Sequence, residues 1–280
     1  MSVDAARLPN LIVVGVQKCG TTALHHYLRR HPAVAMSRPK ELDFFIEERN
    51  WSRGLEWYAA HFDPSARVRG ESSPNYTAVR RFPGVVSRMR RVVPDARIVF
   101  MVRDPVERLI SHWVHRFTYG RERRALDQVV QDDTYLERSQ YATQLRPYLD
   151  AFPRDRLLIL EMDELRQRRR ETLRRVFEFV GVDPAFWSPL FHREPHRSSA
   201  KRERTRRGRR IAASRIGAWA DHLSDPWRAP VLRLMYLPFS RPVVRPVLGD
   251  TACASLKERL RSDAEEFRAL TGRSFENWGV

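Results

Sequence analysis

The segment Gly15-Val16-Gln17-Lys18-Cys19-Gly20-Thr21-Thr22 constrains the fold more than any other part of this sequence. It follows the apolar run Leu11-Ile12-Val13-Val14 and leads into a helical pattern that begins at Ala23. Glycines allow a loop between a strand and a helix to curl so that its amide groups point inward, and the positive end of the helix then faces an anion. The segment therefore predicts a strand, a phosphate-binding loop and a helix in direct succession.

The order of residues in this loop argues against a nucleoside triphosphate. A triphosphate-binding P-loop places its lysine after the second glycine and just before Ser or Thr. Here Lys18 precedes Gly20 by two residues, and Thr21 and Thr22 open the helix. The structural alternative is a plain turn with a threonine as the helix N-cap and a solvated Lys18.

Short β-rich runs alternate with helical stretches along the first 162 residues. The runs predict strands at 11–16, 68–71, 97–102 and 157–162, and helices at 21–30, 51–62, 84–93 and 105–117. This alternation favours an α/β class, P-loop-like three-layer fold with a central parallel sheet and helices on both faces. Ligands of such sheets bind beyond the carboxyl ends of the strands, where Lys18 and Arg103 both lie. The length predicts a single domain over residues 1–280.

Two later stretches lack a regular pattern. Residues 192–210 are poor in apolar side chains and rich in arginine, which predicts an exposed or mobile connection. Residues 237–246 contain three prolines, so regular structure is not expected there. A last helix is predicted over 254–270, ending at Gly272.

The charge and cysteine content define the setting more than the function. The formal net charge of +17 suits an anionic ligand, but much of the arginine falls on helix faces that are usually solvated. The two cysteines, Cys19 and Cys253, show no disulfide framework or metal-ligand spacing. No secretory leader or apolar run of the roughly 18 residues needed to span a membrane is visible, so a cytoplasmic protein is predicted.

Several motifs together resemble the sulfotransferases that use 3'-phosphoadenosine-5'-phosphosulfate (PAPS). Their order is closest to the carbohydrate, heparan sulfate type branch of that family, in a soluble, bacterial-like form. The motifs are the loop around Lys18, Pro39-Lys40-Glu41-Leu42-Asp43-Phe44-Phe45, Leu55-Glu56-Trp57-Tyr58, Gly70-Glu71-Ser72-Ser73-Pro74-Asn75-Tyr76, Val102-Arg103-Asp104-Pro105 with Arg108 and Ser111, and Leu270-Thr271-Gly272-Arg273-Ser274-Phe275 with Trp278. The resemblance implies a transferase that moves a sulfuryl group from PAPS to an acceptor hydroxyl and releases 3',5'-ADP.

The resemblance and the chemistry of sulfuryl transfer assign roles to individual residues. Glu41 is the expected general base, and Lys18 is expected to stabilise the leaving phosphate. His115 is a second catalytic candidate, and Arg103 with Ser111 is the expected clamp for the 3'-phosphate. The nucleotide-binding set is completed by the loop residues Cys19, Gly20, Thr21, Thr22 and Ala23.

Each assignment has a structural alternative. Glu41 could belong to a solvated charged cluster, and Arg103 could form a local ion pair with Asp104. Arg108 could simply lie on the solvated face of its helix, and His115 could be structural. No metal is expected, because Arg103 follows the strand where a nucleoside-triphosphate enzyme would carry an acidic magnesium ligand.

Two departures from the heparan-modifying relatives limit the assignment of an acceptor. Those relatives usually carry His and Lys where this chain has Asp43 and Ser72, which disfavours a polyanionic sugar. They also close over the donor with a Lys-Gly-Arg loop, for which Arg245 is the candidate substitute here. A small-molecule, glycan or lipid hydroxyl all stay open, and nucleic acid is not expected. The rival functions are a P-loop kinase of a small molecule and a non-catalytic nucleic-acid or anionic-membrane binder that uses residues 201–210.

Overall fold

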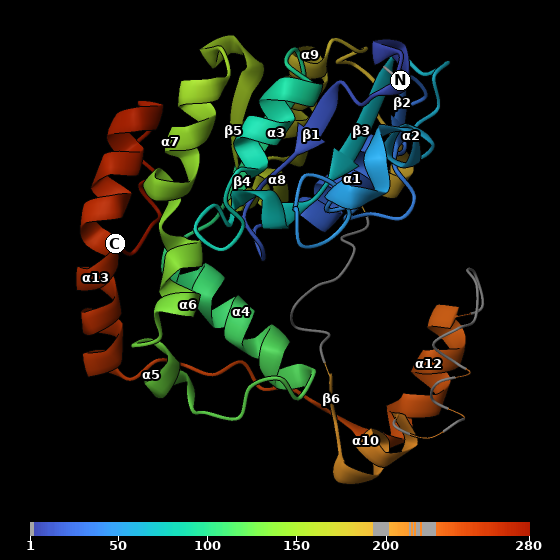
Figure 1. Ribbon diagram of the computed structural model, residues 1–280. Coiled ribbons are helices and arrows are strands. Elements are labelled where there is room, and N and C mark those ends of the chain that lie inside the picture. The colour runs from blue at the N-terminus through green and yellow to red at the C-terminus, as the bar shows by residue number, and fades with distance from the viewer. Residues whose placement is uncertain (1–2, 193–201, 213, 215, 217–218, 220–227) are drawn as a thin grey trace.

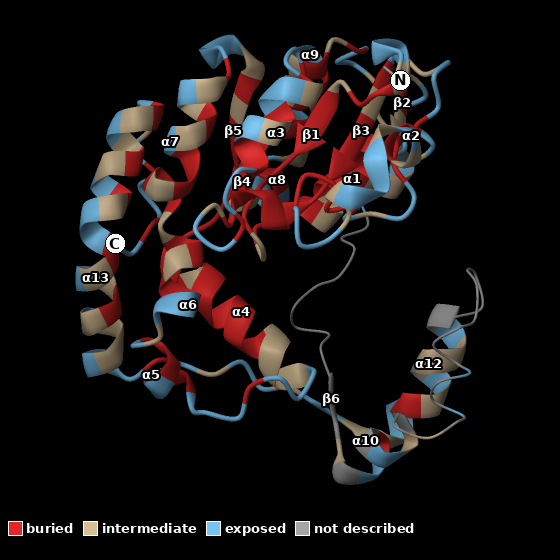
Figure 2. Cartoon of the chain, in the orientation of Figure 1, coloured by how far each residue is buried: buried red, intermediate tan, exposed pale blue. Residues whose placement is uncertain are grey.

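A five-stranded parallel sheet forms the centre of the molecule, with the strand order β2-β3-β1-β4-β5 (Figure 1). The computed structural model describes the chain except for residues 1–2, 193–201, 213, 215, 217–218 and 220–227. The sheet consists of β1 (Leu11–Val13), β2 (Val34–Met36), β3 (Val68–Ser72), β4 (Arg97–Val102) and β5 (Leu157–Glu161). These strands are largely buried, as Figure 2 shows, because helices cover both faces of the sheet.

The helices follow the connections between these strands. They are α1 (Thr21–Leu28), α2 (Gly54–Ala59), α3 (Val85–Val92), α4 (Pro105–Thr118), α5 (Leu126–Val129), α6 (Asp133–Leu136), α7 (Tyr141–Ala151), α8 (Met162–Gln167), α9 (Arg169–Val180), α10 (Arg206–Ala212), α12 (Arg228–Tyr236) and α13 (Asp250–Thr271). The β1–β2 and β3–β4 crossovers run in opposite directions along the sheet. Because parallel crossovers are right-handed, α1 and α3 fall on opposite faces. Helix α7 packs on α3 and α13, so the predicted α/β three-layer fold is confirmed.

The loop that follows β1 passes so close to β4 that residue 15 has to be glycine. A Cβ atom at Gly15 would lie 2.2 Å from the Cβ of Met101, so only glycine fits there. The amides of Val14 and Val16 continue the ladder by donating to the carbonyls of Val99 and Met101 at 3.0 and 2.9 Å. The strand expected at 11–16 is therefore correct in its hydrogen bonding, although the regular strand ends at Val13.

Local sequence signals fix the ends of two helices that frame the site. Helix α4 begins at Pro105, and the Asp104 side chain accepts a hydrogen bond from the Glu107 amide at 2.8 Å. Helix α13 ends at Gly272, which has a φ of 67°. The prediction of helix over 254–270 is confirmed, with four extra residues at its start.

The two stretches expected to be irregular contain regular structure in their described parts. Residues 193–201 lie outside the described part of the chain. Beyond them, β6 (Arg202–Arg204) pairs antiparallel with β7 (Ser240–Pro242), and α10 follows β6. The expectation of a loop at 202–210 and of no regular structure at 237–246 was therefore wrong. Pro242 is tolerated because a two-stranded sheet consists only of edges, where a missing N–H can face solvent.

Two hydrophobic clusters hold the described elements together. The larger one surrounds the central sheet, and the smaller one packs α4 against α5, α6 and α13 through residues such as Leu109, Trp113, Val129 and Leu256. Among the described helices, none combines the length and the apolar character needed to cross a membrane. The single domain over residues 1–280 stays a prediction.

Candidate active site

The loop that runs from the end of β1 to the first turn of α1 is called the donor loop, after the sulfuryl donor that the sequence predicts it to bind. Lys18 has a φ of 78° and Gly20 a φ of 89°, and Gly20 is the N-cap of α1. The first amides of a helix have no intrahelical partner and carry its positive partial charge, so those of Thr21 and Thr22 provide anion-binding groups. The loop therefore turns through left-handed backbone at Lys18 and Gly20 into the first turn of α1, and phosphate binding there stays a prediction.

Tyr141 ties this loop to the end of β4. Its hydroxyl donates to the carbonyl oxygen of Arg103 at 2.8 Å and lies 3.7 Å from the Cys19 Sγ. Cys19 is fully buried, and burial raises the pKa of its thiol to about 11, which keeps it an unreactive thiol. No sequence pattern indicated this role for Tyr141, because its two partners lie 38 and 122 positions away.

Arg103 lies buried at the carboxyl end of β4 with part of its guanidinium unsatisfied. One terminal nitrogen pairs with the Glu107 carboxylate at 2.7 Å, one turn along α4. Its Nε is buried and has no hydrogen-bond partner. The alternative of an Arg103–Asp104 ion pair is wrong, because Asp104 caps α4 and accepts a second bond from the Gly279 amide at 2.7 Å.

Arg245 approaches the same carboxylate from a distant part of the chain. Its guanidinium pairs with Glu107, so Glu107 lies between the guanidinium groups of Arg103 and Arg245. The structure thus brings two arginines that are 142 positions apart in the sequence to one carboxylate. A dianion that replaced the Glu107 carboxylate would contact both guanidinium groups.

Helix α4 carries three further residues singled out by sequence. Ser111 is buried on this helix, two turns after Arg103, and His115 is partly buried with its ring 4.9 Å from that of Tyr119. Arg108 is fully buried, and its Nε and terminal nitrogen donate to Ser139 Oγ at 2.6 Å and the Tyr135 carbonyl at 2.7 Å. A solvated position for Arg108 was wrong, since it joins α4 to the segment before α7.

The loop that carries Glu41 has a defined and strained backbone. Glu41 and Asp43 have φ values of 67° and 47°, which non-glycine residues rarely adopt. The Glu41 amide donates to the Ser72 carbonyl at 3.1 Å, and the Asp43 amide donates to Ser73 Oγ at 3.1 Å. The Glu41 side chain is half-exposed and pairs with Lys40 Nζ at 2.5 Å. Backbone strain that is held by such contacts is typical of functional loops.

The charged residues around Glu41 do not form one solvated cluster. Asp43 is buried, pairs with Arg49, and accepts from the Asn75 amide at 3.1 Å. Burial raises the pKa of the Asp43 carboxyl, although Arg49 opposes the shift. Glu47 instead pairs with Arg88. Glu41 is therefore an exposed carboxylate with a buried acid two residues away, and Glu47 and Glu48 of the same loop are exposed as well.

A neutral histidine stands beside the residue that departs from the heparan-type pattern. The Nδ1 of His25 shares a 3.0 Å hydrogen bond with Ser72 Oγ, and both side chains are buried. Burial, with a smaller contribution from nearby Lys40, lowers the pKa of His25 to about 3. Ser72, which stands where the heparan-modifying relatives usually carry lysine, therefore makes an uncharged contact with His25.

Glu71 is a buried acid on β3 that three hydroxyl groups surround. Tyr58 and Tyr76 donate to its Oε1 at 2.5 and 2.9 Å, and Ser73 donates to Oε2 at 2.9 Å. Burial raises the pKa of Glu71 to about 7, while these hydrogen bonds act in the opposite direction. This network holds the end of β3 in place. Ser72 and Ser73, which contact the Glu41 loop, lie at that end.

The parallel sheet and the loop at the end of β1 define an α/β domain with a P-loop-like fold. Residues 8–193 match the family model described as the sulfotransferase domain. The chain belongs to this sulfotransferase family, which consists of transferase enzymes, and the family predicted from the motifs is confirmed.

Curated relatives agree with this assignment. The chain is 36% identical over 111 residues to the membrane-associated sulfotransferase kil1 of Dictyostelium discoideum, covering 38% of this chain and 22% of that protein. It is 31% identical over 202 residues to the bifunctional heparan sulfate N-deacetylase/N-sulfotransferase 2 of Bos taurus, covering 64% and 22% of the two chains. It is 30% identical over 192 residues to the mouse heparan sulfate glucosamine 3-O-sulfotransferase 3B1, covering 63% and 47%. The chain thus spans less than half the length of these relatives.

A sulfotransferase from Alicyclobacillus acidocaldarius has the same fold, with a TM-score of 0.70 at 22% identity. The alignment covers 97% of this chain and 99% of that one. The likeness confirms the fold.

Proposed function

We propose that this protein is a PAPS-dependent sulfotransferase that transfers a sulfuryl group to an acceptor hydroxyl. The observation that supports this donor most is Arg103, a buried guanidinium at the carboxyl end of β4 with an unpartnered Nε. A buried N–H group without a hydrogen-bond acceptor destabilises the folded protein unless a ligand supplies the acceptor. The 3'-phosphate of PAPS, which ATP lacks, would supply the missing acceptor.

The donor would lie between the loop at Lys18 and the start of α4. The amides of Thr21 and Thr22 and the Lys18 ammonium would bind the 5'-phosphosulfate. Arg103 and Ser111 would hold the 3'-phosphate, and Arg245 would approach it through its shared contact with Glu107. Cys19, Gly20 and Ala23 would contribute backbone contacts only, which fits the inert thiol of Cys19.

The transfer would be a single in-line displacement at sulfur. The acceptor oxygen attacks sulfur, its proton passes to the Glu41 carboxylate, and the bond between sulfur and the bridging phosphate oxygen breaks. Lys18 stabilises the negative charge that develops on that oxygen, and 3',5'-ADP leaves. Glu41 suits the role of base because its carboxylate is half-exposed on a loop held firmly by β3. His115 is the second candidate for this role.

The rival functions fit the site less well. A kinase of the P-loop type would need an acidic magnesium ligand near the end of a core strand, whereas β4 is followed by Arg103. A nucleic-acid or membrane binder would use the basic residues 201–210, but that role leaves the unsatisfied Arg103 unexplained. The acceptor is proposed to be a small-molecule, glycan or lipid hydroxyl.

Titration calorimetry separates these functions. We expect 3',5'-ADP to bind without magnesium and more tightly than ATP with magnesium. Tighter binding of magnesium ATP would favour the kinase, and binding of neither would refute a nucleotide-dependent transferase.

Glu41→Gln tests the base, because the amide keeps the shape of the side chain but does not accept a proton. General-base catalysis contributes roughly 100- to 10,000-fold, so turnover should fall by that range while 3',5'-ADP affinity is kept. Lys40→Gln is the matched control for loss of the Lys40–Glu41 ion pair. If Glu41→Gln retains more than about a tenth of wild-type turnover, the base role moves to His115, and His115→Asn should then cause the loss.

A further inference from the structure

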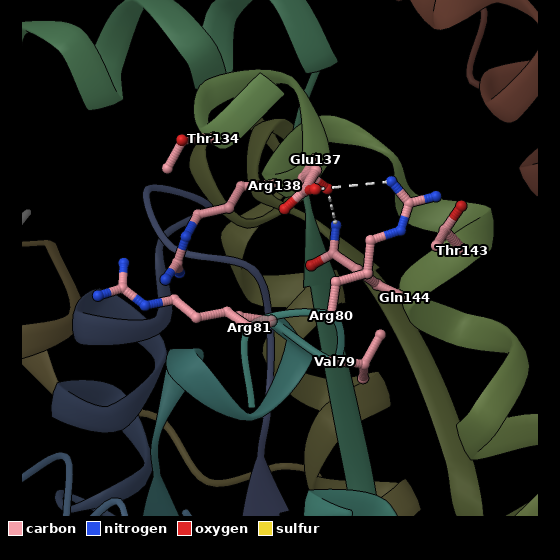
Figure 3. A pocket seen from close by; sticks show the side chains of 9 residues that line it. Val79, Arg80, Arg81, Thr134, Glu137, Arg138, Thr143 and Gln144 are labelled. Carbon is pink, nitrogen blue, oxygen red and sulfur yellow. Dashed lines mark hydrogen bonds and ion pairs between the residues drawn. The ribbon is translucent and has the colours of Figure 1, made fainter. Parts of the chain in front are cut away.

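A small pocket lies between the segment after β3 and the start of α7 (Figure 3). Its volume is about 30 Å³. On this scale one water needs roughly 10–15 Å³, so the pocket has room for a group of a few heavy atoms and not for a nucleotide or a sugar chain. Its polar lining includes Arg80, Arg81, Glu137, Arg138 and Gln144.

Arg138 is a cation in this pocket whose charge no carboxylate balances directly. The residue is only 9% exposed, and one of its terminal nitrogens donates a 3.4 Å hydrogen bond to the Asn75 amide oxygen. It forms no ion pair within the described part of the chain. Asp43 acts on it electrostatically, but Asp43 is already paired with Arg49. Burying an unpaired guanidinium is costly unless an anion completes the site.

A second guanidinium strengthens this positive field. Figure 3 shows Arg81 and Arg138 extending toward the same end of the pocket, whereas Arg80 points to the opposite side. Arg80 is satisfied there by Gln140 at 3.2 Å and Glu137 at 3.8 Å. Burial lowers the pKa of Arg138 to about 10, and the charges of Arg108 and Arg81 contribute to the shift. The side of the pocket that Arg81 and Arg138 share is therefore suited to a negative charge.

Gln144 adds an acceptor to this positive site. Its Nε2 donates to the carbonyl oxygens of Glu137 at 3.1 Å and Gln140 at 2.9 Å, which fixes the orientation of the amide. Its Oε1 is buried and has no hydrogen-bond partner. A ligand that satisfied every group here would present anionic oxygens to the two arginines and one hydrogen-bond donor to Gln144.

We propose that Arg81, Arg138 and Gln144 form a binding site for a small oxyanion that carries its own hydrogen-bond donor, with hydrogen phosphate as the simplest case. The P–OH group of hydrogen phosphate donates to Gln144 Oε1, and its other oxygens accept from the guanidinium groups. Sulfate has the same shape and charge but no hydrogen, so it leaves Gln144 unsatisfied. Anion binding at this site does not depend on the proposed sulfuryl transfer.

Calorimetric titration with sodium phosphate and with sodium sulfate tests this site, at pH 7, constant ionic strength, and with 3',5'-ADP both absent and in excess. We expect saturable phosphate binding in both cases, at least tenfold tighter than sulfate binding. A site for phosphate that 3',5'-ADP abolishes would be the donor loop and would overturn the proposal. Absence of saturable phosphate binding, or equal binding of the two anions, would also overturn it.

Two matched variants locate the binding. Arg81→Gln should weaken phosphate binding roughly tenfold or more, because a charge-assisted contact is lost. Arg80→Gln removes the same charge at the adjacent position and should leave the phosphate affinity nearly unchanged. An equal loss of phosphate affinity in both variants would mean that only net charge matters, and it would overturn the assignment of the site to Arg81. Gln144→Met should bring phosphate and sulfate affinities together. Its fold is checked by circular dichroism, and if it does not fold, the wild-type preference between the two anions still decides the proposal.

Discussion

The buried carboxyl of Glu71 should make the stability of this protein fall as the pH rises from about 4.5 to about 7. Its pKa is about 7 in the folded chain against 4.5 as the ordinary value. Between these values the folded state holds a proton that the unfolded state releases, so the free energy of unfolding decreases with pH. A difference of 2.5 pKa units, at about 1.36 kcal/mol per unit, gives about 3 to 4 kcal/mol in total, slightly more than the part that falls between pH 4 and pH 8.5.

Glu71→Gln isolates this contribution, because glutamine keeps the size of the side chain and does not titrate. Urea unfolding of both proteins at half-unit steps from pH 4 to pH 8.5 gives the difference in unfolding free energy at each pH. We expect the wild type to lose about 3 kcal/mol relative to Glu71→Gln across this range, with the change complete near pH 8. The exposed acid Glu48, changed to Gln, provides the control for removing a surface carboxylate.

The reasoning would be refuted by a difference that stays constant with pH. It would also fail if the wild type gained stability relative to Glu71→Gln as the pH rose. That sign would mean that the hydroxyls of Tyr58, Tyr76 and Ser73 stabilise the carboxylate more than burial destabilises it.

Three further predictions concern the donor site. Arg103→Ala should weaken 3',5'-ADP binding by roughly tenfold to a hundredfold, through loss of a charge-assisted contact, and leave adenosine 5'-phosphosulfate binding nearly unchanged; equal losses in calorimetry would remove the 3'-phosphate assignment. Lys18→Ala should reduce single-turnover rates more than donor affinity, since its charge matters most in the transition state, and equal reductions would make it a ground-state anchor. Glu107→Gln should tighten 3',5'-ADP binding by roughly two- to tenfold, because Arg103 and Arg245 lose a competing carboxylate; weaker binding would show that Glu107 positions them.

Four strands of the sheet and the donor loop were predictable because their signals are local, whereas the three-residue edge strand β2 was not predicted. The apolar runs at Leu11 and Arg97 and the glycines of the loop each act within a few residues. The pairing of β6 with β7 was missed, since two three-residue strands that are far apart in the sequence leave no periodic pattern.

The contacts that complete the site could not be read from the sequence for the same reason. A solvated position was one alternative for Arg108 because arginine usually lies in solvent, and its buried partners Ser139 and Tyr135 follow 31 and 27 residues later. Arg245 was the candidate substitute for the Lys-Gly-Arg loop of the relatives, although its position could not be aligned with that loop. Its contact with Glu107 is visible only in the folded structure. The roles of Glu41, His115 and Ser111 stay predictions.

The positive φ angles of Lys18, Glu41 and Asp43 have a consequence for protein engineering. A side chain in the left-handed region costs roughly 1 kcal/mol or more, and glycine removes that cost. A search for stabilising substitutions would therefore favour glycine or asparagine at all three positions. Those changes would erase the ammonium and the carboxylate proposed to act on the leaving oxygen and the acceptor. Variants chosen only for heat resistance should therefore lose activity through substitutions in these two loops, while their free energy of unfolding rises.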